Sequence, residues 1–395
     1  MYNKKFTCKT LCMFLVAFML ISTLAVCIQP VAYAVEASKT TNSVEFNDAF
    51  DETDVLVAVA LHVRCEPLLD KRVRPAVITP LYDLSDNVIA YDVTMSDGSY
   101  LVVNANKDNP MIIEFAESRI QNIRSDKKKY YLAPGIILEK ESNDGQEMKL
   151  VNTQYRVSSQ SAELLELQTA FSSVLNTPND TLARQHSATK VQLENYVQST
   201  KDKEKDEYDF LISSANMPSG TYTEDLIPDI LSIRPFGTTS EFDGVNGADN
   251  HCAATSAFNM VLYYRYRMGN PIASDDREDV FTDIHERVGN GPVTPLQYRN
   301  RITRYIENDT SYSITVSNLG DTWTNYKNEI SGDRMTVMCV WPALFSAHMI
   351  NGVGTREYSS GTNYCVVLNN WYSQSVVYTV FGTELYDLSK IHIYS

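Results

Sequence analysis

The stretch DGVNGADNHCAATSAFNMVLYY, residues 243–264, changes from a loop rich in Gly and Asp to a strongly helical run at Cys252. A thiol at the start of a helix faces backbone N–H groups without intrahelical partners and lies at the positive end of the helix dipole. Both effects favour the thiolate, the nucleophilic form of cysteine. Cys252 is therefore a candidate nucleophile, although a small buried residue that begins a helix is an equally ordinary use of Cys.

A thiol nucleophile needs a base that is itself held by an orienting group, and the C-terminal segment contains candidates for both. His348 begins the predicted strand HMINGVGTREY, and a turn within 358–362 sends the chain back through NYCVVLNNWY. A hairpin with this turn places Asn369 and Asn370 at or next to the position opposite His348.

Only one of the two asparagines is expected to reach the imidazole, because successive strand residues point to opposite faces. Asn369 shares its face with Trp371, whose ring would cover an Asn–His hydrogen bond from water. We therefore expect Asn369 to fix the tautomer and orientation of His348, with Asn370 as the alternative. An Asn that ends a strand and feeds a turn is the competing structural explanation.

An acyl-transfer site also needs donors for the oxyanion that develops on the substrate. The backbone N–H of Cys252 is one candidate. The side-chain amide of Asn246, six residues upstream, is the other, with Asn250 as a further option. Either asparagine could equally close an Asx-turn in this loop. His251 is a poor base for the adjacent thiol, because neighbouring side chains diverge at a helix start.

The N-terminus has the pattern of an export signal. Three lysines precede an apolar run over residues 11–28, and the small residues of VAYA (31–34) suit a signal peptidase. We expect cleavage after Ala34 and a secreted, extracellular protein, with attachment to the cell surface left open. The alternatives are a retained membrane anchor and a lipoprotein acylated at Cys27, where the bulky Val26 is unfavourable.

The chain has a formal charge of −15, and loss of the three signal lysines takes it to −18. A chain this acidic is not expected to bind nucleic acid or an anionic membrane. Four cysteines follow the signal: Cys65, Cys252, Cys339 and Cys365. A disulfide between Cys339 and Cys365 and two buried thiols both remain open, and neither a zinc site nor another cofactor is expected.

The pattern of hydrophobic residues changes along the chain. Short β-rich runs separated by turn residues fill 77–115, typical of an antiparallel meander, and helical spacing follows over 162–199. The mixed-charge run 201–207 is a solvated linker or an exposed cleavage site. From residue 224 helices precede strands, which predicts an α+β domain with two packed lobes and a cleft. The expected parts are a signal peptide (1–34), a β-rich segment (35–160), a helical and charged linker (161–223) and an α+β domain (224–395); the resemblance described next implies that the second is a prodomain and the last a catalytic domain.

The order of loop, Cys and helix, then His at a strand start, then Asn-x-Trp after a hairpin resembles the papain-like cysteine peptidases. NHCAATSAFNMVLYY is similar to the nucleophile helix of secreted bacterial streptopain-like and bacteriocin-leader peptidases, and the meander resembles a streptopain-like prodomain. The resemblance implies a two-lobed catalytic domain made as a proenzyme, whose prodomain covers the cleft and is removed on activation. The sequence departs from many such relatives at Ala253-Ala254, where they have Gly-Pro, and at Asn246, where they have Gln.

These features predict a secreted cysteine peptidase in which Cys252, His348 and Asn369 cleave a protein or peptide substrate through a thioester. A catalytically inactive papain-fold binding module and a thiol acyltransferase are the alternatives. The sequence does not specify the substrate, because specificity depends on the walls of the cleft.

Overall fold

The computed structural model describes most of the chain from Phe50 to Tyr394. The predicted signal peptide and most of the charged run after residue 200 lie outside the described residues. None of the helices in the described part is both long and apolar enough to cross a bilayer. The described residues are 50–118, 127–141, 147–151, 156–199, 206–214, 220–228, 230, 236–248, 251–268, 276–290, 293–340, 348–371, 376–382 and 385–394.

The N-terminal half, defined here as residues 50–214, combines a meander with helices. Strands β1 to β4 pair in succession and antiparallel, which confirms the predicted meander. Its Asp97-Gly98 turn requires glycine, because Gly98 has a φ of 93°. The helices are α2 (Glu52–Cys65), α3 (Ala162–Leu175), α4 (Asp180–Ser199) and α5 (Glu207–Ser213), and the strands are β1 (Pro75–Tyr82), β2 (Val88–Met95), β3 (Tyr100–Asn104), β4 (Ile112–Ala116), β5 (Lys129–Ala133), β6 (Ile136–Lys140), β7 (Glu147–Leu150) and β8 (Arg156–Ser158).

The C-terminal half, residues 220–394, has the predicted order of helices before most of the strands. Three strands of this half, β9, β10 and β15, were not predicted. Its elements are β9 (Tyr222–Leu226), the short 3-10 turn η1 (Val245–Gly247), α6 (Cys252–Met268), α7 (Arg277–Val288), α8 (Pro295–Asp309), β10 (Ser313–Asn318), α9 (Trp323–Ser331), β11 (Thr336–Val340), β12 (His348–Tyr358), β13 (Asn363–Leu368), β14 (Val377–Val380) and β15 (Tyr386–Tyr394).

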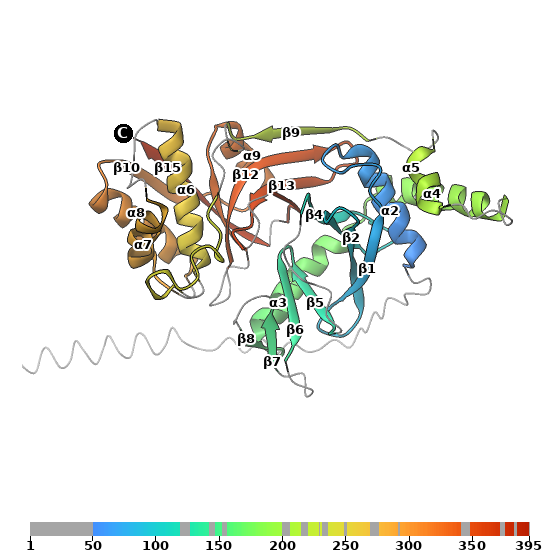
Figure 1. Cartoon of the computed structure of the whole chain (residues 1–395), viewed down its shortest axis with the longest axis horizontal. Helices are drawn as coiled ribbons and strands as arrows, with labels where there is room; N and C mark the ends of the chain where they lie inside the picture. Colours follow the sequence, from blue (N-terminus) through green and yellow to red (C-terminus); the bar gives the residue numbers. More distant parts are fainter. Residues whose placement is uncertain are drawn as a thin grey trace, which may run out of the picture. The chain divides into compact units, whose positions relative to one another are not determined.

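One mixed sheet runs through both halves, so the described part is an α+β structure (Figure 1). β4 of the meander pairs antiparallel with β14, with Phe115 opposite Tyr378 and Glu114 opposite Thr379. From there the sheet continues through β13, β12, β11, β15 and β10 in one direction. In the other it continues through β3, β2, β1 and β5 to β8, and only β1 and β5 are parallel. Phe50–Ser395 forms one unit by its contacts, so the division at residues 160 and 223 stays a prediction.

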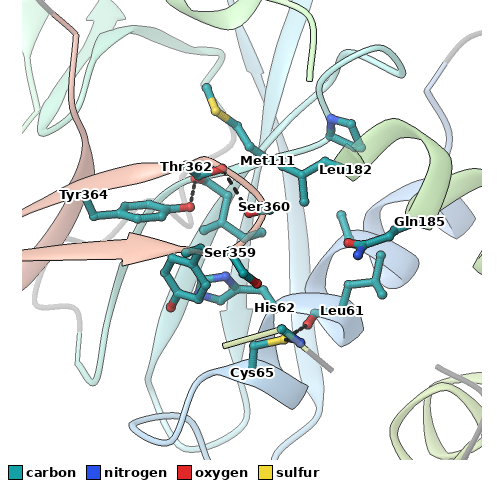
Figure 2. A pocket seen from close by; sticks show the side chains of 15 residues that line it. Leu61, His62, Cys65, Met111, Leu182, Gln185, Ser359, Ser360, Thr362 and Tyr364 are labelled. Carbon is teal, nitrogen blue, oxygen red and sulfur yellow. Dashed lines mark hydrogen bonds between the residues drawn. The ribbon is translucent and has the colours of Figure 1, made fainter. Parts of the chain in front are cut away.

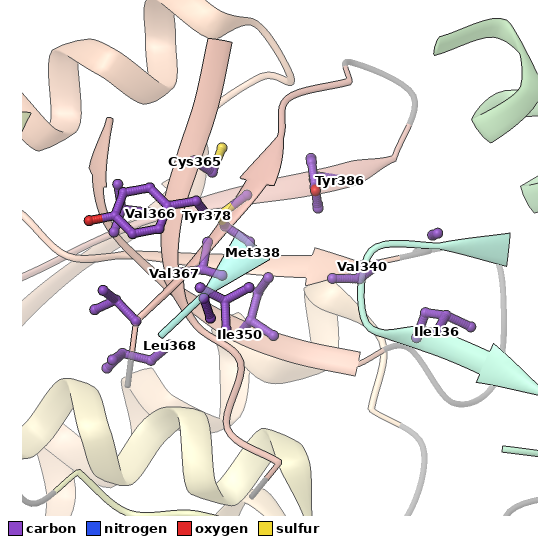
Figure 3. Packing of buried hydrophobic residues seen from close by; sticks show 14 of the residues in the cluster. Ile136, Met338, Val340, Ile350, Cys365, Val366, Val367, Leu368, Tyr378 and Tyr386 are labelled. Carbon is purple, nitrogen blue, oxygen red and sulfur yellow. The ribbon is translucent and has the colours of Figure 1, made fainter. Parts of the chain in front are cut away.

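Buried side chains of β11 to β14 form the centre of the C-terminal half (Figure 3). Cys339 and Cys365 belong to this core and are buried, and no disulfide joins them. Cys339 lies on β11 and Cys365 on β13, and β12 runs between these strands. Of the two alternatives left open by the sequence, the buried thiols are therefore correct. The bridge would have needed neighbouring strands.

Candidate active site

Cys252 is the first residue of α6, as predicted. Backbone N–H groups of Met349, of Ala253 and of Cys252 itself face its sulfur. Burial raises the pKa of the Cys252 thiol, and these N–H groups oppose that rise. The contact with Met349 matters most for the site, because Met349 directly follows His348 in β12. In the resting structure the group is a neutral thiol.

His348 is the first residue of β12 and is buried. Its Nε2 donates a hydrogen bond to the carbonyl oxygen of Asn369 at 2.5 Å, and its ring stacks on Trp371 with centroids 4.0 Å apart. Burial lowers the pKa of His348 to about 3, and the bond to Asn369 only partly offsets this. Its Nδ1 is buried and has no hydrogen-bond partner. The imidazole is therefore neutral, and its basic nitrogen, Nδ1, accepts no hydrogen bond.

The two asparagines of the hairpin have different positions. The part of Asn369 that reaches His348 is its main-chain carbonyl, while its side-chain oxygen accepts the N–H of Trp371 at 3.2 Å. The side chain of Asn370 points toward α6 and donates to the carbonyl of Met349 at 3.0 Å. Both residues follow the last residue of β13, and Asn370 has a left-handed φ of 61°, so strand alternation does not set the directions of their side chains. Neither side-chain amide binds the imidazole.

Asn370 is the centre of a buried amide cluster that the sequence analysis did not identify. It donates to Asn351 Oδ1 at 2.9 Å and accepts from Asn259 of α6, also at 2.9 Å. Asn351 in turn donates to the carbonyl of Ser256 at 3.1 Å. The cluster holds α6, which carries Cys252, against the strand that begins with His348. A signal was present in the sequence, since Asn259 interrupts the apolar face of the nucleophile helix.

A small cavity of about 20 Å³ lies beside His348. Glu114, Pro134 and Gly135 of the N-terminal half line it together with residues of the C-terminal sheet. The carboxylate of Glu114 accepts hydrogen bonds from Tyr100, Tyr131 and the backbone N–H of Gly135. A cavity this small holds about one water molecule. The N-terminal half therefore contributes part of the wall of this cavity next to the candidate base.

The predicted side-chain donor for the oxyanion lies in a turn. Asn246 is exposed in the turn η1 and has a φ of 49°, which fits the turn-forming alternative. Asn250 lies outside the described residues. The Nε2 of His251 meets the carbonyl of Thr239 at 2.9 Å, consistent with its exclusion as a base. The backbone N–H of Cys252, the other candidate donor, lies at the start of α6.

Within the described residues, no group of three or more His, Cys, Asp or Glu side chains is arranged to hold a metal ion. At the candidate site, Cys252 supplies a thiol and His348 an imidazole. Such a pair supports nucleophilic attack on an acyl carbon.

No family model and no curated protein matches this sequence. Among solved structures, the chain is similar to a fragment of prointerpain A from Prevotella intermedia, a cysteine peptidase zymogen. The TM-score is 0.36 and the sequence identity 7%, over 80% of this chain and 98% of that one. At this TM-score the likeness carries no argument about family or activity.

Proposed function

We propose that the protein is a secreted cysteine peptidase made as a proenzyme, with Cys252 as nucleophile, His348 as base and Asn369 as the residue that orients the base. The observation that carries the proposal is the contact between the Cys252 sulfur and the backbone N–H of Met349. In β12, Met349 directly follows His348, whose imidazole has a held Nε2 and an Nδ1 without a hydrogen-bond partner. These are the parts of a thiol–imidazole pair.

In the proposed reaction, Nδ1 of His348 takes the thiol proton and the sulfur attacks the peptide carbonyl carbon. The oxyanion is stabilised by the backbone N–H of Cys252 at the start of α6. As the C–N bond breaks, the imidazolium returns its proton to the departing amine and a thioester remains. Water, deprotonated by the same Nδ1, then hydrolyses the thioester and regenerates the thiol.

The proenzyme part of the proposal is supported by the pKa shifts and by the cavity beside His348. A raised pKa of Cys252 and a lowered pKa of His348 both favour the neutral pair over the reactive ion pair. Glu114 and Gly135 of the N-terminal half line the small cavity beside the imidazole. Removing this wall would rehydrate the imidazole and raise its pKa, which would favour proton transfer from the thiol.

A second candidate is an inactive binding module with the same fold. It is favoured by the exposed position of Asn246 and by the absence of a hydrogen bond to Nδ1 of His348. A thiol acyltransferase shares the thioester and differs only in using an amine in place of water.

The test is mass spectrometry of a mixed peptide substrate incubated with the intact chain and with the chain nicked by an external protease. The nicked wild type should cleave internal peptide bonds, while nicked Cys252→Ala and His348→Ala should not. Added amines that appear on the products would instead identify an acyltransferase. If neither form of the wild type cleaves or transfers, the inactive module is correct.

Export is proposed on the N-terminal pattern alone. Expression of the full chain in a bacterial host with a general secretory pathway, followed by N-terminal sequencing of the exported protein, tests it. Cleavage after Ala34 is expected. A product that keeps residues 1–34 would contradict the signal peptide.

A further inference from the structure

The contact between β4 and β14 has the packing of a protein core. The ring of Phe115 stacks on Tyr378, with centroids 4.6 Å apart and planes at 7°, and meets Tyr364 edge-on at 5.6 Å. Tyr364 also donates its hydroxyl to the carbonyl of Ile112 at 2.5 Å. The contact surface between the two halves is called the seam here. Because strand pairing and buried rings form it, the two halves pack against each other as parts of one core.

A buried guanidinium forms a second connection between the halves. Arg356 of β12 is 1% exposed, and its Nε and Nη2 donate to Glu224 of β9 at 3.0 and 2.6 Å. Its Nη1 donates to Glu66, which follows α2 in the N-terminal half. The rings of Tyr222 and Tyr378 lie over the guanidinium carbon, with centroids at 4.4 and 4.1 Å. One cation of the C-terminal half is thus neutralised from both halves.

The carboxylate of Glu66 is fully buried and also accepts the hydroxyl of Tyr358. Two donors of the C-terminal half therefore converge on one acid of the N-terminal half. A buried charge that loses its partner is strongly unfavourable, whereas a complete pair is tolerated. The arrangement makes Glu66 a specific requirement of this seam, even if the ion pair adds little net stability of its own.

The seam is not packed throughout. A cavity of about 80 Å³ lies between α2, α4 and the turn from β12 to β13 (Figure 2). His62 and Leu182 line it from the N-terminal half, and Ser359 and Thr362 from the other. Apolar burial is interrupted there, so the attraction between the halves is concentrated at β4 with β14 and around Arg356.

We propose that the N-terminal half remains bound as a non-covalent subunit after the chain is cut between the halves, held at β14 and at Arg356, and is not released by cleavage alone. The inference takes from the proposed function only the expectation that the chain is cut there. The association itself does not require peptidase activity. The partner of the C-terminal half is thus its own N-terminal half, recognised through a strand that carries Phe115 and through the carboxylate of Glu66.

The experiment uses the full chain in a Cys252→Ser background, with the recognition sequence of a specific external protease inserted between Ser214 and Gly220. After complete cutting, size-exclusion chromatography and a dilution series measure the association of the two fragments. The nicked chain is expected to elute where the uncut chain does. Glu66→Gln should weaken the association by about 10- to 100-fold, because the amide leaves the charge of Arg356 incompletely compensated.

The matched control is Asp54→Asn, which changes another buried acid of α2 whose ion pair with Lys190 lies inside the N-terminal half. It should leave the association within about threefold of the parent. The proposal is wrong if the parent fragments separate without denaturant, or if Glu66→Gln and Asp54→Asn weaken the association equally. If uncut Glu66→Gln lacks the parent circular dichroism spectrum, Phe115→Leu replaces it, with the same outcomes. Because the nucleophile is absent throughout, these results do not depend on whether the protein is a peptidase.

Discussion

The carbonyl oxygen of Asn369 accepts the Nε2–H of His348 at 2.5 Å. A carbonyl can only accept, so this bond places the proton of the neutral imidazole on Nε2 and leaves Nδ1 as the base. The orienting group of the site is therefore a main-chain atom. A side chain can be removed from such a position without removing the hydrogen bond.

Asn369→Ala should accordingly retain activity within about tenfold of the wild type, whereas His348→Ala should lose at least about a thousandfold in kcat. The measurement is steady-state hydrolysis by the nicked chain. A loss with Asn369→Ala that matches the loss with His348→Ala would mean that the side-chain amide turns to the imidazole during the reaction.

Asn370→Ala should act on stability. It removes three hydrogen bonds from the buried amide cluster, including the one that the Oδ1 of Asn351 accepts. It also places alanine at a φ of 61°. A loss of about 2–4 kcal/mol in the free energy of unfolding is expected from urea titration. The comparison variant is Asn369→Ala, which should change stability by less than about 1 kcal/mol.

The rate at which iodoacetamide alkylates Cys252 in the uncut chain should rise steadily from pH 6 to above pH 9. Burial raises the pKa of this thiol, so the reactive thiolate forms only at alkaline pH. Cys65 must be replaced by Ser for a clean signal, because it is also partly accessible. A rate that is already constant between pH 5 and 8 would show that the ion pair exists before activation.

Stability should fall as the pH is lowered from about 7 to 5. The pKa of His348 is lowered to about 3 from an ordinary value of 6.5, so between these values the unfolded chain binds a proton that the folded chain does not. The contribution of His348 is thus present above pH 6.5 and is lost progressively toward pH 3. From pH 7 to 5 it amounts to about 2 kcal/mol.

His348→Gln should reduce that pH dependence by this amount in urea titrations at the two pH values. Burial also lowers the pKa of His62, to about 4. His62→Gln should therefore also reduce the loss of stability at low pH. An unchanged pH dependence in His348→Gln would contradict the burial of a neutral imidazole.

Gly352→Ala should destabilise the C-terminal half. A Cβ at this position of β12 would lie 2.6 Å from the ring of Tyr326 and would also collide with the hydroxyl of Thr336. Overpacking of this kind costs about 1–3 kcal/mol, measurable by thermal or urea unfolding. Adding Thr336→Ala should recover part of the loss, and no recovery would indicate that the ring of Tyr326 is the main obstacle.

Local pattern in the sequence was sufficient to predict where Cys252 and His348 stand in the fold. The helix start at Cys252 depends on a change from turn residues to helix formers, and the strand after His348 depends on β-rich composition. The alternation argument for Asn369 over Asn370 assumed a strand, whereas both residues follow the last residue of β13. It did not predict that Asn369 uses its carbonyl, because strand register fixes a residue's place and not which of its atoms makes the contact.

The pairing of strands that are distant in the sequence could not be predicted. β15 pairs with β11, but the polar residues of YDLSKIHIY obscure the hydrophobic pattern by which a strand is predicted. The sequence left the disulfide open because nothing in the spacing of Cys339 and Cys365 shows that β12 runs between their strands. The pairing of β4 with β14 was missed for the same reason, since hydrophobic periodicity carries no information about distant partners.

Phe115 and Tyr378, which face each other across that pairing, are 263 residues apart in the sequence. During synthesis the meander is complete long before β14 exists, so the apolar edge of β4 stays unsatisfied while the remaining chain is made. An unpaired edge of this kind is a template for self-association. The nascent N-terminal half is therefore expected to depend on a holding chaperone until its distant partner strand arrives.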